Sequence, residues 1–166
     1  TVSAGDLGGY IQSEENLSQE SGKAWVSGNS WVFDNAHVSG DAHVFGDAWV
    51  FDNARVFDNA LVSGDALVEN DSWVSGDARV FDNARVFDNA RVFDNAWISD
   101  NAWVFDNARV FDNARVSGKA CVFVNARVSG KACVSGDARV FDNVRVFGDA
   151  RVFDNAWISD NAWVFD

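Results

Sequence analysis

Residues 78–95 read ARVFDNARVFDNARVFDN, which is one six-residue unit written three times in succession. The same period runs from Trp25 to the last residue without an insertion or a deletion. Val or Ile occupies every sixth position from Val26 to Val164, and a small residue lies two positions before nearly every one of them. Self-similarity at a fixed short period is typical of solenoid proteins, so the repeat decides the fold class before any other signal.

Each unit combines a short strand with a corner. In the unit that begins at Ala54, Ala54 and Val56 alternate with Arg55 and Phe57, which is the period-two pattern of a strand with one inward and one outward side. The last two positions are drawn from Asp, Asn, Gly and Lys, and nearly every pair holds a Gly or an Asn that tolerates a left-handed backbone. We expect inward Ala and Val, outward Arg and Phe, and a turn after every strand.

Strands this short cannot bury an apolar side alone, so successive strands are expected to coil and stack as a parallel β-helix. The pattern of an aliphatic residue, two turn residues and a small residue resembles the hexapeptide repeat of left-handed β-helix proteins. That resemblance implies an all-β, single-stranded, left-handed β-solenoid with three faces and about 18 residues per turn. The 24 repeat units then predict about eight turns.

The chain divides into an N-terminal cap, residues 1–23, and the repeat, residues 24–166. Solenoids need an irregular element to protect their first coil, and we expect a short strand at Gly9 to Gln12 to begin it. The cap contains LGGYI at residues 7–11 and ENLS at residues 15–18. It resembles the N-terminal segment of uncharacterised bacterial and prophage hexapeptide-repeat proteins that are often labelled acyltransferases.

Composition excludes several classes of protein. The net charge of −12 comes mainly from Asp in the corners and argues against a nucleic-acid partner. No apolar run is long enough to span a membrane, and no signal peptide begins the sequence, so we expect a cytoplasmic protein, with a phage particle or a cell surface as the other locations. Cys121 and Cys133 lie two units apart, which places them on different faces, and both are expected to be free thiols.

In such a coil, outward side chains that are three hexapeptides apart form columns along each face. Face A is predicted to carry two neighbouring columns that are together mostly aromatic, one with four tryptophans (Trp31, Trp49, Leu67, Arg85, Trp103, Cys121, Arg139, Trp157) and one with six phenylalanines (Phe33, Phe51, Glu69, Phe87, Phe105, Phe123, Phe141, Ser159). Face B begins with His37, Arg55 and Trp73 and then carries four consecutive arginines, Arg91, Arg109, Arg127 and Arg145. Face C, the most polar, carries Trp25, His43, Leu61, Arg79, Trp97, Arg115, Cys133 and Arg151.

An aromatic face of this size exceeds what soluble monomers usually expose. We therefore predict a non-catalytic structural module that self-associates through face A, and at open coil ends, as a dimer or an end-to-end stack. The alternative is that neighbouring aromatic rings cover one another on a monomer. The predicted interface residues are Trp31, Phe33, Trp49, Phe51, Phe87, Trp103, Phe105, Phe123, Phe141 and Trp157.

Two other functions stay open. The hexapeptide resemblance implies an acyltransferase that uses acyl-CoA, with His37 or His43 as general base, but these histidines lie on neighbouring faces and no inserted loop builds a pocket. Rows of Trp and Phe also suit a glycan-binding module of the adhesin type. Two histidines cannot supply a three-His zinc site, and the Asp-rich corners are typical of turns, so no metal and no cofactor is predicted.

Overall fold

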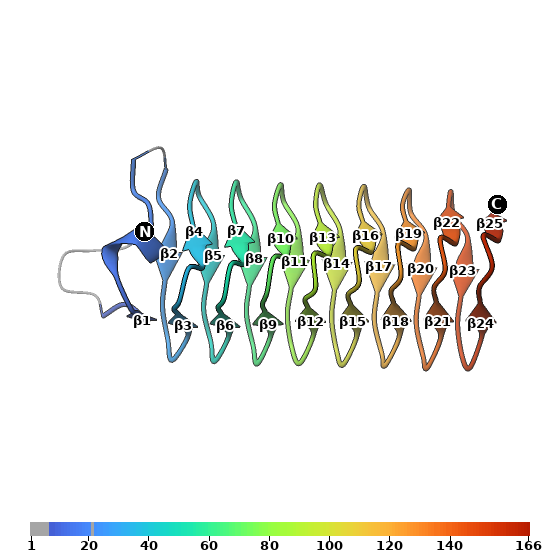
Figure 1. The fold of residues 1–166 in the computed structure, drawn as a ribbon, viewed down its shortest axis with the longest axis horizontal. Coiled ribbons are helices and arrows are strands. Elements are labelled where there is room, and N and C mark those ends of the chain that lie inside the picture. The colour runs from blue at the N-terminus through green and yellow to red at the C-terminus, as the bar shows by residue number, and fades with distance from the viewer. Residues whose placement is uncertain (1–6, 21) are drawn as a thin grey trace.

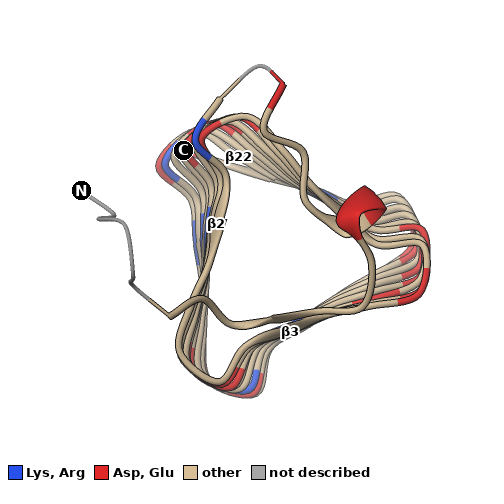
Figure 2. Ribbon diagram, turned by 90° about the vertical axis from the view of Figure 1, so that its left-hand side faces the viewer, with Lys and Arg blue, Asp and Glu red and all other residues tan. Residues whose placement is uncertain are grey.

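The computed structural model describes residues 7–20 and 22–166 as a straight three-sided coil (Figures 1 and 2). Three parallel sheets form its sides, and each strand pairs with the strand one coil away. Face A consists of β1 (Tyr10–Ile11), β3 (Trp31–Val32), β6 (Trp49–Val50), β9 (Leu67–Val68), β12 (Arg85–Val86), β15 (Trp103–Val104), β18 (Cys121–Val122), β21 (Arg139–Val140) and β24 (Trp157–Ile158).

Faces B and C each contain eight strands. Face B consists of β4 (His37–Val38), β7 (Arg55–Val56), β10 (Trp73–Val74), β13 (Arg91–Val92), β16 (Arg109–Val110), β19 (Arg127–Val128), β22 (Arg145–Phe147) and β25 (Trp163–Phe165). Face C consists of β2 (Trp25–Val26), β5 (His43–Val44), β8 (Leu61–Val62), β11 (Arg79–Val80), β14 (Trp97–Ile98), β17 (Arg115–Val116), β20 (Cys133–Val134) and β23 (Arg151–Val152).

The coil is left-handed. Seen from the N-terminal end, the chain runs counter-clockwise from β2 through β3 to the sheet that contains β22, while it recedes from the viewer (Figure 2). Partner strands of the repeat are three hexapeptides apart, as in the pairing of Arg91 with Arg109. The predicted all-β parallel solenoid, with three faces and three hexapeptides in each turn, is therefore confirmed.

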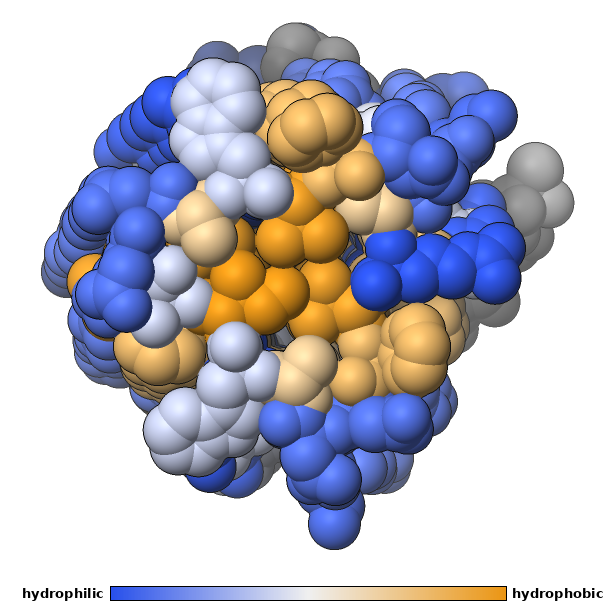
Figure 3. All heavy atoms as spheres, turned by 90° about the vertical axis from the view of Figure 1, so that its right-hand side faces the viewer, coloured by the Kyte–Doolittle hydropathy of each residue, from blue (hydrophilic) through white to orange (hydrophobic). Residues whose placement is uncertain are grey.

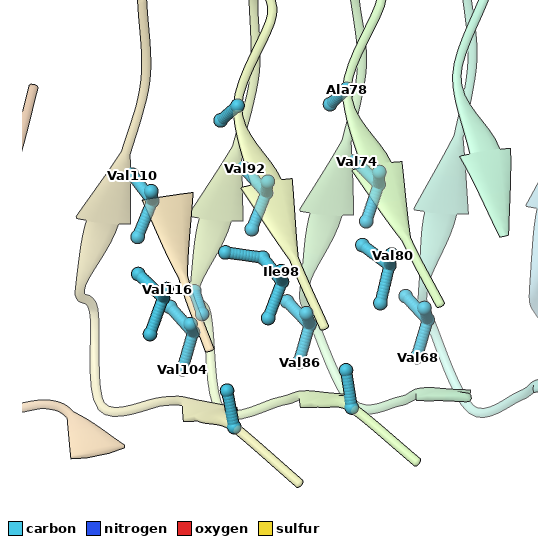
Figure 4. Close-up of a cluster of buried hydrophobic side chains, with 14 of the residues drawn as sticks. Val68, Val74, Ala78, Val80, Val86, Val92, Ile98, Val104, Val110 and Val116 are labelled. Atoms are coloured by element: carbon cyan, nitrogen blue, oxygen red, sulfur yellow. The ribbon is translucent and has the colours of Figure 1, made fainter. Parts of the chain in front are cut away.

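The interior is filled by the small and branched residues of the repeat. Every Ala and Val at these positions is almost fully buried in the middle coils, and the Val side chains of all three sheets meet on the axis (Figure 4). Ile98 is the largest of the fully buried side chains. Most hexapeptides thus contribute one Ala and one Val to the core, which pack across the axis against the other two faces and against the coils above and below.

The corners differ from the prediction in which residue bends the chain. We expected Asn or Gly to take the left-handed conformation, but after most strands the first corner residue has positive φ even when it is Asp, as at Asp58 (φ 59°). The Asp58 carboxylate accepts a hydrogen bond from the backbone N–H of Gly76 in the next coil, at 3.1 Å. Asp100 and Asp112 make the same contact with Gly118 and Gly130, both at 3.0 Å. Corner Asp thus supplies an acceptor between coils, which offsets its strained backbone.

Within the predicted cap, residues 7–20 add a further coil in front of the repeat, and β1 lies inside the strand predicted at Gly9 to Gln12. Strand β1 pairs with β3, and Leu17 forms a bridge with Val38. Ile11 and Leu17 keep the spacing of one repeat unit, but both lie three and a half units from their partners because three extra residues precede β2. Asn16, in the short 3₁₀ helix η1 (Glu14–Asn16), is buried and donates to the carbonyl oxygens of Asp34 and Ala36.

At the C-terminal end the coil leaves its interior uncovered. The apolar residues of the last coil form an orange centre surrounded by polar side chains (Figure 3), and Ile158 and Val164 are only partly buried. The equivalent Val140 and Val146, one coil earlier, are fully buried. Within the described residues no helix is long and apolar enough to cross a membrane.

Candidate functional site

The outward columns follow the predicted register. On face A, Trp31 pairs with Trp49, Trp49 with Leu67 and Trp103 with Cys121, as a spacing of three hexapeptides requires. All ten predicted interface residues lie on this one face, in the column that faces outward from the strands or in the column that follows it. The backbone therefore brings them together, and their exposure separates them into two groups.

The tryptophans form the exposed group. Trp31 and Trp49 are each 45% exposed, and their ring centroids lie 6.5 Å apart. Tyr10, on β1, stacks on Trp31 at 4.6 Å and extends the column by one ring. With Leu67 below Trp49, the column holds four consecutive uncharged side chains. Beside them lies a groove of about 600 Å³ that also includes Ile11, Gln12 and Phe33.

The phenylalanines form a half-buried group. Phe87, Phe105, Phe123 and Phe141 stack face to face, with successive centroids 4.8, 4.8 and 4.9 Å apart. Phe33 and Phe51 stack in the same way at 5.1 Å. Such stacking covers both faces of each inner ring and leaves mainly its edge in solvent. This part of face A therefore agrees with the alternative that neighbouring rings cover one another.

Glu69 interrupts the phenylalanine column. It occupies the place between Phe51 and Phe87, where a ring would join the two stacks. Burial in these surroundings, together with the carboxylates of Asp52 and Asp88, raises the pKa of Glu69, although Arg85 acts in the opposite direction. The charged form of Glu69 is therefore disfavoured by its place in the column.

Arginines cover Trp73 on face B and Trp97 on face C. Trp73 lies between Arg55 and Arg91, whose guanidinium carbons are 5.5 and 4.7 Å from the ring centroid. On face C, Arg79 and Arg115 enclose Trp97 at 5.1 and 5.0 Å. Both tryptophans are less exposed than Trp31 and Trp49. The sequence showed Arg and Trp in one column, but not that they would stack as cation–π pairs.

The two histidines are not brought together. His37 lies on face B and His43 on face C. Nδ1 of His37 is 2.8 Å from the carbonyl oxygen of Glu15, so the neutral ring carries its proton on Nδ1. A groove of about 860 Å³ adjoins this ring and is lined largely by residues 14–20. His37 is thus the only one of the pair placed beside the N-terminal coil, and the two cannot act on one substrate atom as a pair.

The cysteines behave as expected. Cys121 lies on face A and Cys133 on face C, and both thiols are free. Each thiol donates weakly to the carbonyl oxygen two residues before it. Among residues 7–20 and 22–166, no group of three or more His, Cys, Asp or Glu side chains is placed to hold a metal ion.

The sequence reasoning missed Tyr10. It precedes Ile11 as an outward residue precedes Val in every repeat unit, and Gly9 fills the place of the small inward residue. A Cβ at Gly9 would lie 2.7 Å from Oγ of Ser30, so only glycine fits there without a shift. The repeat spacing of Ile11 and Leu17 was the signal that could have placed Tyr10 on face A.

The chain is a β-solenoid repeat protein. A family model described as the YdcK beta solenoid repeat matches residues 54–70, 78–92, 84–100 and 108–122. These segments lie in the middle coils and cover less than half of the chain, and the description names a repeat rather than an activity. None of the curated proteins compared with the chain matches it.

Proposed function

We propose that the protein is a rigid structural module that associates with a second copy of itself through the N-terminal half of face A. The observation that carries the proposal is the uninterrupted uncharged column of Tyr10, Trp31, Trp49 and Leu67. On faces B and C, by contrast, arginines cover Trp73 and Trp97. Among residues 7–20 and 22–166, the face A column is the one that offers exposed rings without arginine cover over adjacent coils, and such patches favour a protein partner.

The geometry favours a copy of the same chain as the partner. The strands that carry the rings are paired at regular coil spacing, so a second copy turned by a two-fold axis presents the same strand spacing in return. Each coil is hydrogen-bonded to the next along all three faces, as in the 2.9 Å bond from the Arg91 N–H to the Ala108 carbonyl, so the surface is rigid before association. A preformed surface loses little conformational entropy on binding.

The proposal is tested by mass in solution, measured by size-exclusion chromatography with light scattering over a hundredfold range of concentration. The Trp31→Arg/Trp49→Arg double variant should stay monomeric where the parent chain forms dimers. Arg is the residue that fills this column at Arg85 and Arg139, so the coil should tolerate both changes. Trp73→Arg on face B is the matched control and should leave association unchanged.

A monomeric parent chain at every concentration would refute the proposal. Growth into long polymers that survive the double variant would instead assign association to the coil ends, where Ile158 and Val164 are partly uncovered. Circular dichroism of each variant establishes that the β-sheet signal is retained.

Glycan binding is the second candidate, and the exposed rings of Tyr10, Trp31 and Trp49 favour it. Sugar sites also need polar groups that fix orientation. Gln12 lines the groove beside these rings, but its Oε1 already accepts a hydrogen bond from the backbone N–H of Asp34 at 2.7 Å. A glycan array screened with the double variant as control tests this candidate.

The acyltransferase alternative depends on His37 and its groove. It predicts turnover of an acyl-CoA that is lost in His37→Ala and retained in His43→Ala. A parent chain without turnover would remove this alternative.

A further inference from the structure

The hexapeptide SGKACV occurs twice, at residues 117–122 and 129–134. The two copies have the same backbone, since Gly118 and Gly130 both have φ of 70° and the strands β18 and β20 occupy equivalent places on faces A and C. Their neighbours differ. Cys121 lies between Trp103 and Arg139, whereas Cys133 lies between Arg115 and Arg151.

Cys121 leaves one face of Trp103 without an arginine, while Phe87 and Phe105 contact the ring edge-on with centroids 6.0 and 6.5 Å away. Arg85 covers the other face, with its guanidinium carbon 5.2 Å from the ring centroid. Cys121 takes the place that a second arginine fills beside Trp73 and Trp97. The Arg139 guanidinium does not fill the gap, because it stacks on Trp157 at 4.9 Å, on the opposite side from Cys121. Trp103 consequently stays 40% exposed, and the enclosed Trp73 and Trp97 are both less exposed than this.

The gap opens into a groove of about 580 Å³ along the corner before face A. Trp103 and Cys121 line it, and its charged lining residues are Arg85, Lys119, Arg139 and Asp137. Three cations face one carboxylate there, on a chain whose net charge is −12. Burial raises the pKa of the Cys121 thiol, with Asp137 adding to the effect and Arg139 opposing it, so the thiol adds no negative charge near neutral pH.

We propose that this groove binds an aromatic carboxylate, whose ring stacks on the bare face of Trp103 and whose carboxylate pairs with Lys119 and Arg139. Trp103 and Arg139 are two coils apart, which is about 9.6 Å at the spacing of paired strands. A ring in contact with the indole, at about 3.5–4 Å, therefore leaves its acid group within reach of the lysine and the arginine. A cationic ligand would meet three like charges and only one carboxylate.

The inference is independent of the proposed self-association. The groove lies over coils from Asn83 to Arg139, whereas the bare column used for association ends at Leu67. A Trp31→Arg/Trp49→Arg variant that has become monomeric should therefore bind the ligand as the parent chain does.

Isothermal titration calorimetry with naphthoate tests the proposal, and uncharged naphthylmethanol and cationic naphthylmethylammonium serve as comparison probes. Cys121→Arg fills the gap with the residue found beside Trp73 and Trp97, and it should weaken naphthoate binding about tenfold or more, the scale of a lost stacking and ion-pair contact. Cys133→Arg makes the same change in the twin hexapeptide and should leave the affinity within about twofold.

A second pair of variants separates charge from shape. Asn replaces Lys at the equivalent corner positions 83 and 101, so Lys119→Asn should preserve the coil. It should weaken naphthoate binding but leave naphthylmethanol unaffected, and Lys131→Asn should change neither. Equal binding of naphthoate to the parent chain and to Cys121→Arg would overturn the proposal, as would tighter binding of the ammonium probe than of naphthoate. No detectable binding to the parent chain would overturn it as well.

Discussion

The tripeptide Ser-Trp-Val occurs twice in this chain, at residues 30–32 on face A and at residues 72–74 on face B, in two different surroundings. Trp31 stacks on Tyr10 and stays 45% exposed, while Trp73 is enclosed by Arg55 and Arg91. The preceding serines also differ. Oγ of Ser30 donates to the carbonyl oxygens of Ser27 and Val44, whereas Oγ of the fully buried Ser72 has no hydrogen-bond partner. Identical local sequence on one backbone thus gives an exposed aromatic surface in one coil and a covered one in another, because the residues one coil away differ.

The largest effects are expected inside the coil. Ser72→Ala should raise the free energy of unfolding by about 1–2 kcal/mol, because it removes a buried hydroxyl with no partner and restores the usual Ala. Ser30→Ala should lower it by about 1 kcal/mol, because the hydrogen bond that the Ser30 hydroxyl donates to the backbone, mainly to the carbonyl oxygen of Ser27, is lost. Chemical denaturation followed by circular dichroism measures both. Shifts of the same sign in the two variants would show that the serines do not differ as the structure indicates.

Removing the two arginines that enclose Trp73 tests how much their cation–π contacts stabilise the fold. The Arg55→Ala/Arg91→Ala variant should lose about 1–2 kcal/mol of stability, since each cation–π contact is worth about 0.5–1 kcal/mol. Arg109→Ala/Arg127→Ala is the control, because the column neighbours of these two residues are arginines, which repel them, rather than rings. Denaturation midpoints compare the variants, and an equal loss in the control would contradict the cation–π assignment.

Glu69→Phe would complete the phenylalanine column of face A and should add about 1 kcal/mol of stability through two new ring contacts. The sign of its pH effect follows from the raised pKa of Glu69. Below the unfolded pKa, Glu69 is protonated in both the folded and the unfolded chain. As pH rises through the folded pKa, the folded chain loses stability, because the unfolded chain ionises this half-buried carboxyl group more easily. Thermal melts from pH 4 to pH 7 should therefore show a smaller decline in Glu69→Phe than in the parent chain. Glu69→Gln, which removes the charge without adding a ring, separates the two contributions.

The smallest effect is expected for the salt dependence of association through the exposed tryptophans of face A. Each chain carries a net charge of −12, so association through Trp31 and Trp49 should strengthen about threefold or less as salt screens the repulsion between copies. Sedimentation at low and high sodium chloride concentration measures this change. Weaker association at high salt would indicate that ion pairs, rather than rings, join the copies.

Most of the coil could be predicted because one period controls it. A Val at every sixth position fixes which side chains point inward, and the turn of three hexapeptides implied by the family resemblance then fixes every column, from Trp31 to Trp157. The N-terminal coil could not be placed in this way, because three extra residues before β2 shift Ile11 and Leu17 out of step with the rest. Left-handed Asp in the corners was also missed, since the compensating hydrogen bond comes from a residue in the following coil.

Which tryptophans are covered by arginines could not be predicted from the sequence, for a different reason. The sequence gives the order Arg85, Trp103 and Cys121 along the column. It does not give the side-chain rotamer of each arginine, which decides whether its guanidinium stacks on the residue one coil before it or one coil after it. Arg139 stacks on Trp157 rather than filling the gap at Cys121, and that choice creates the groove beside Trp103.

Because each turn holds three hexapeptides, the number of hexapeptides that precede a strand decides on which of the three faces it lies. Adding or removing a full turn would change the length of the rod by about 4.8 Å and leave every face in line. Adding a single hexapeptide after Val68 would rotate everything that follows by one third of a turn, so that the Arg79 column of face C would continue from Leu67 and Trp49. The three extra residues before β2 avoid such a rotation, because they are accommodated at a corner and the strands on both sides stay in register. The order of side chains along each face therefore depends on how many residues separate the strands, and it is preserved only when whole turns are added or removed.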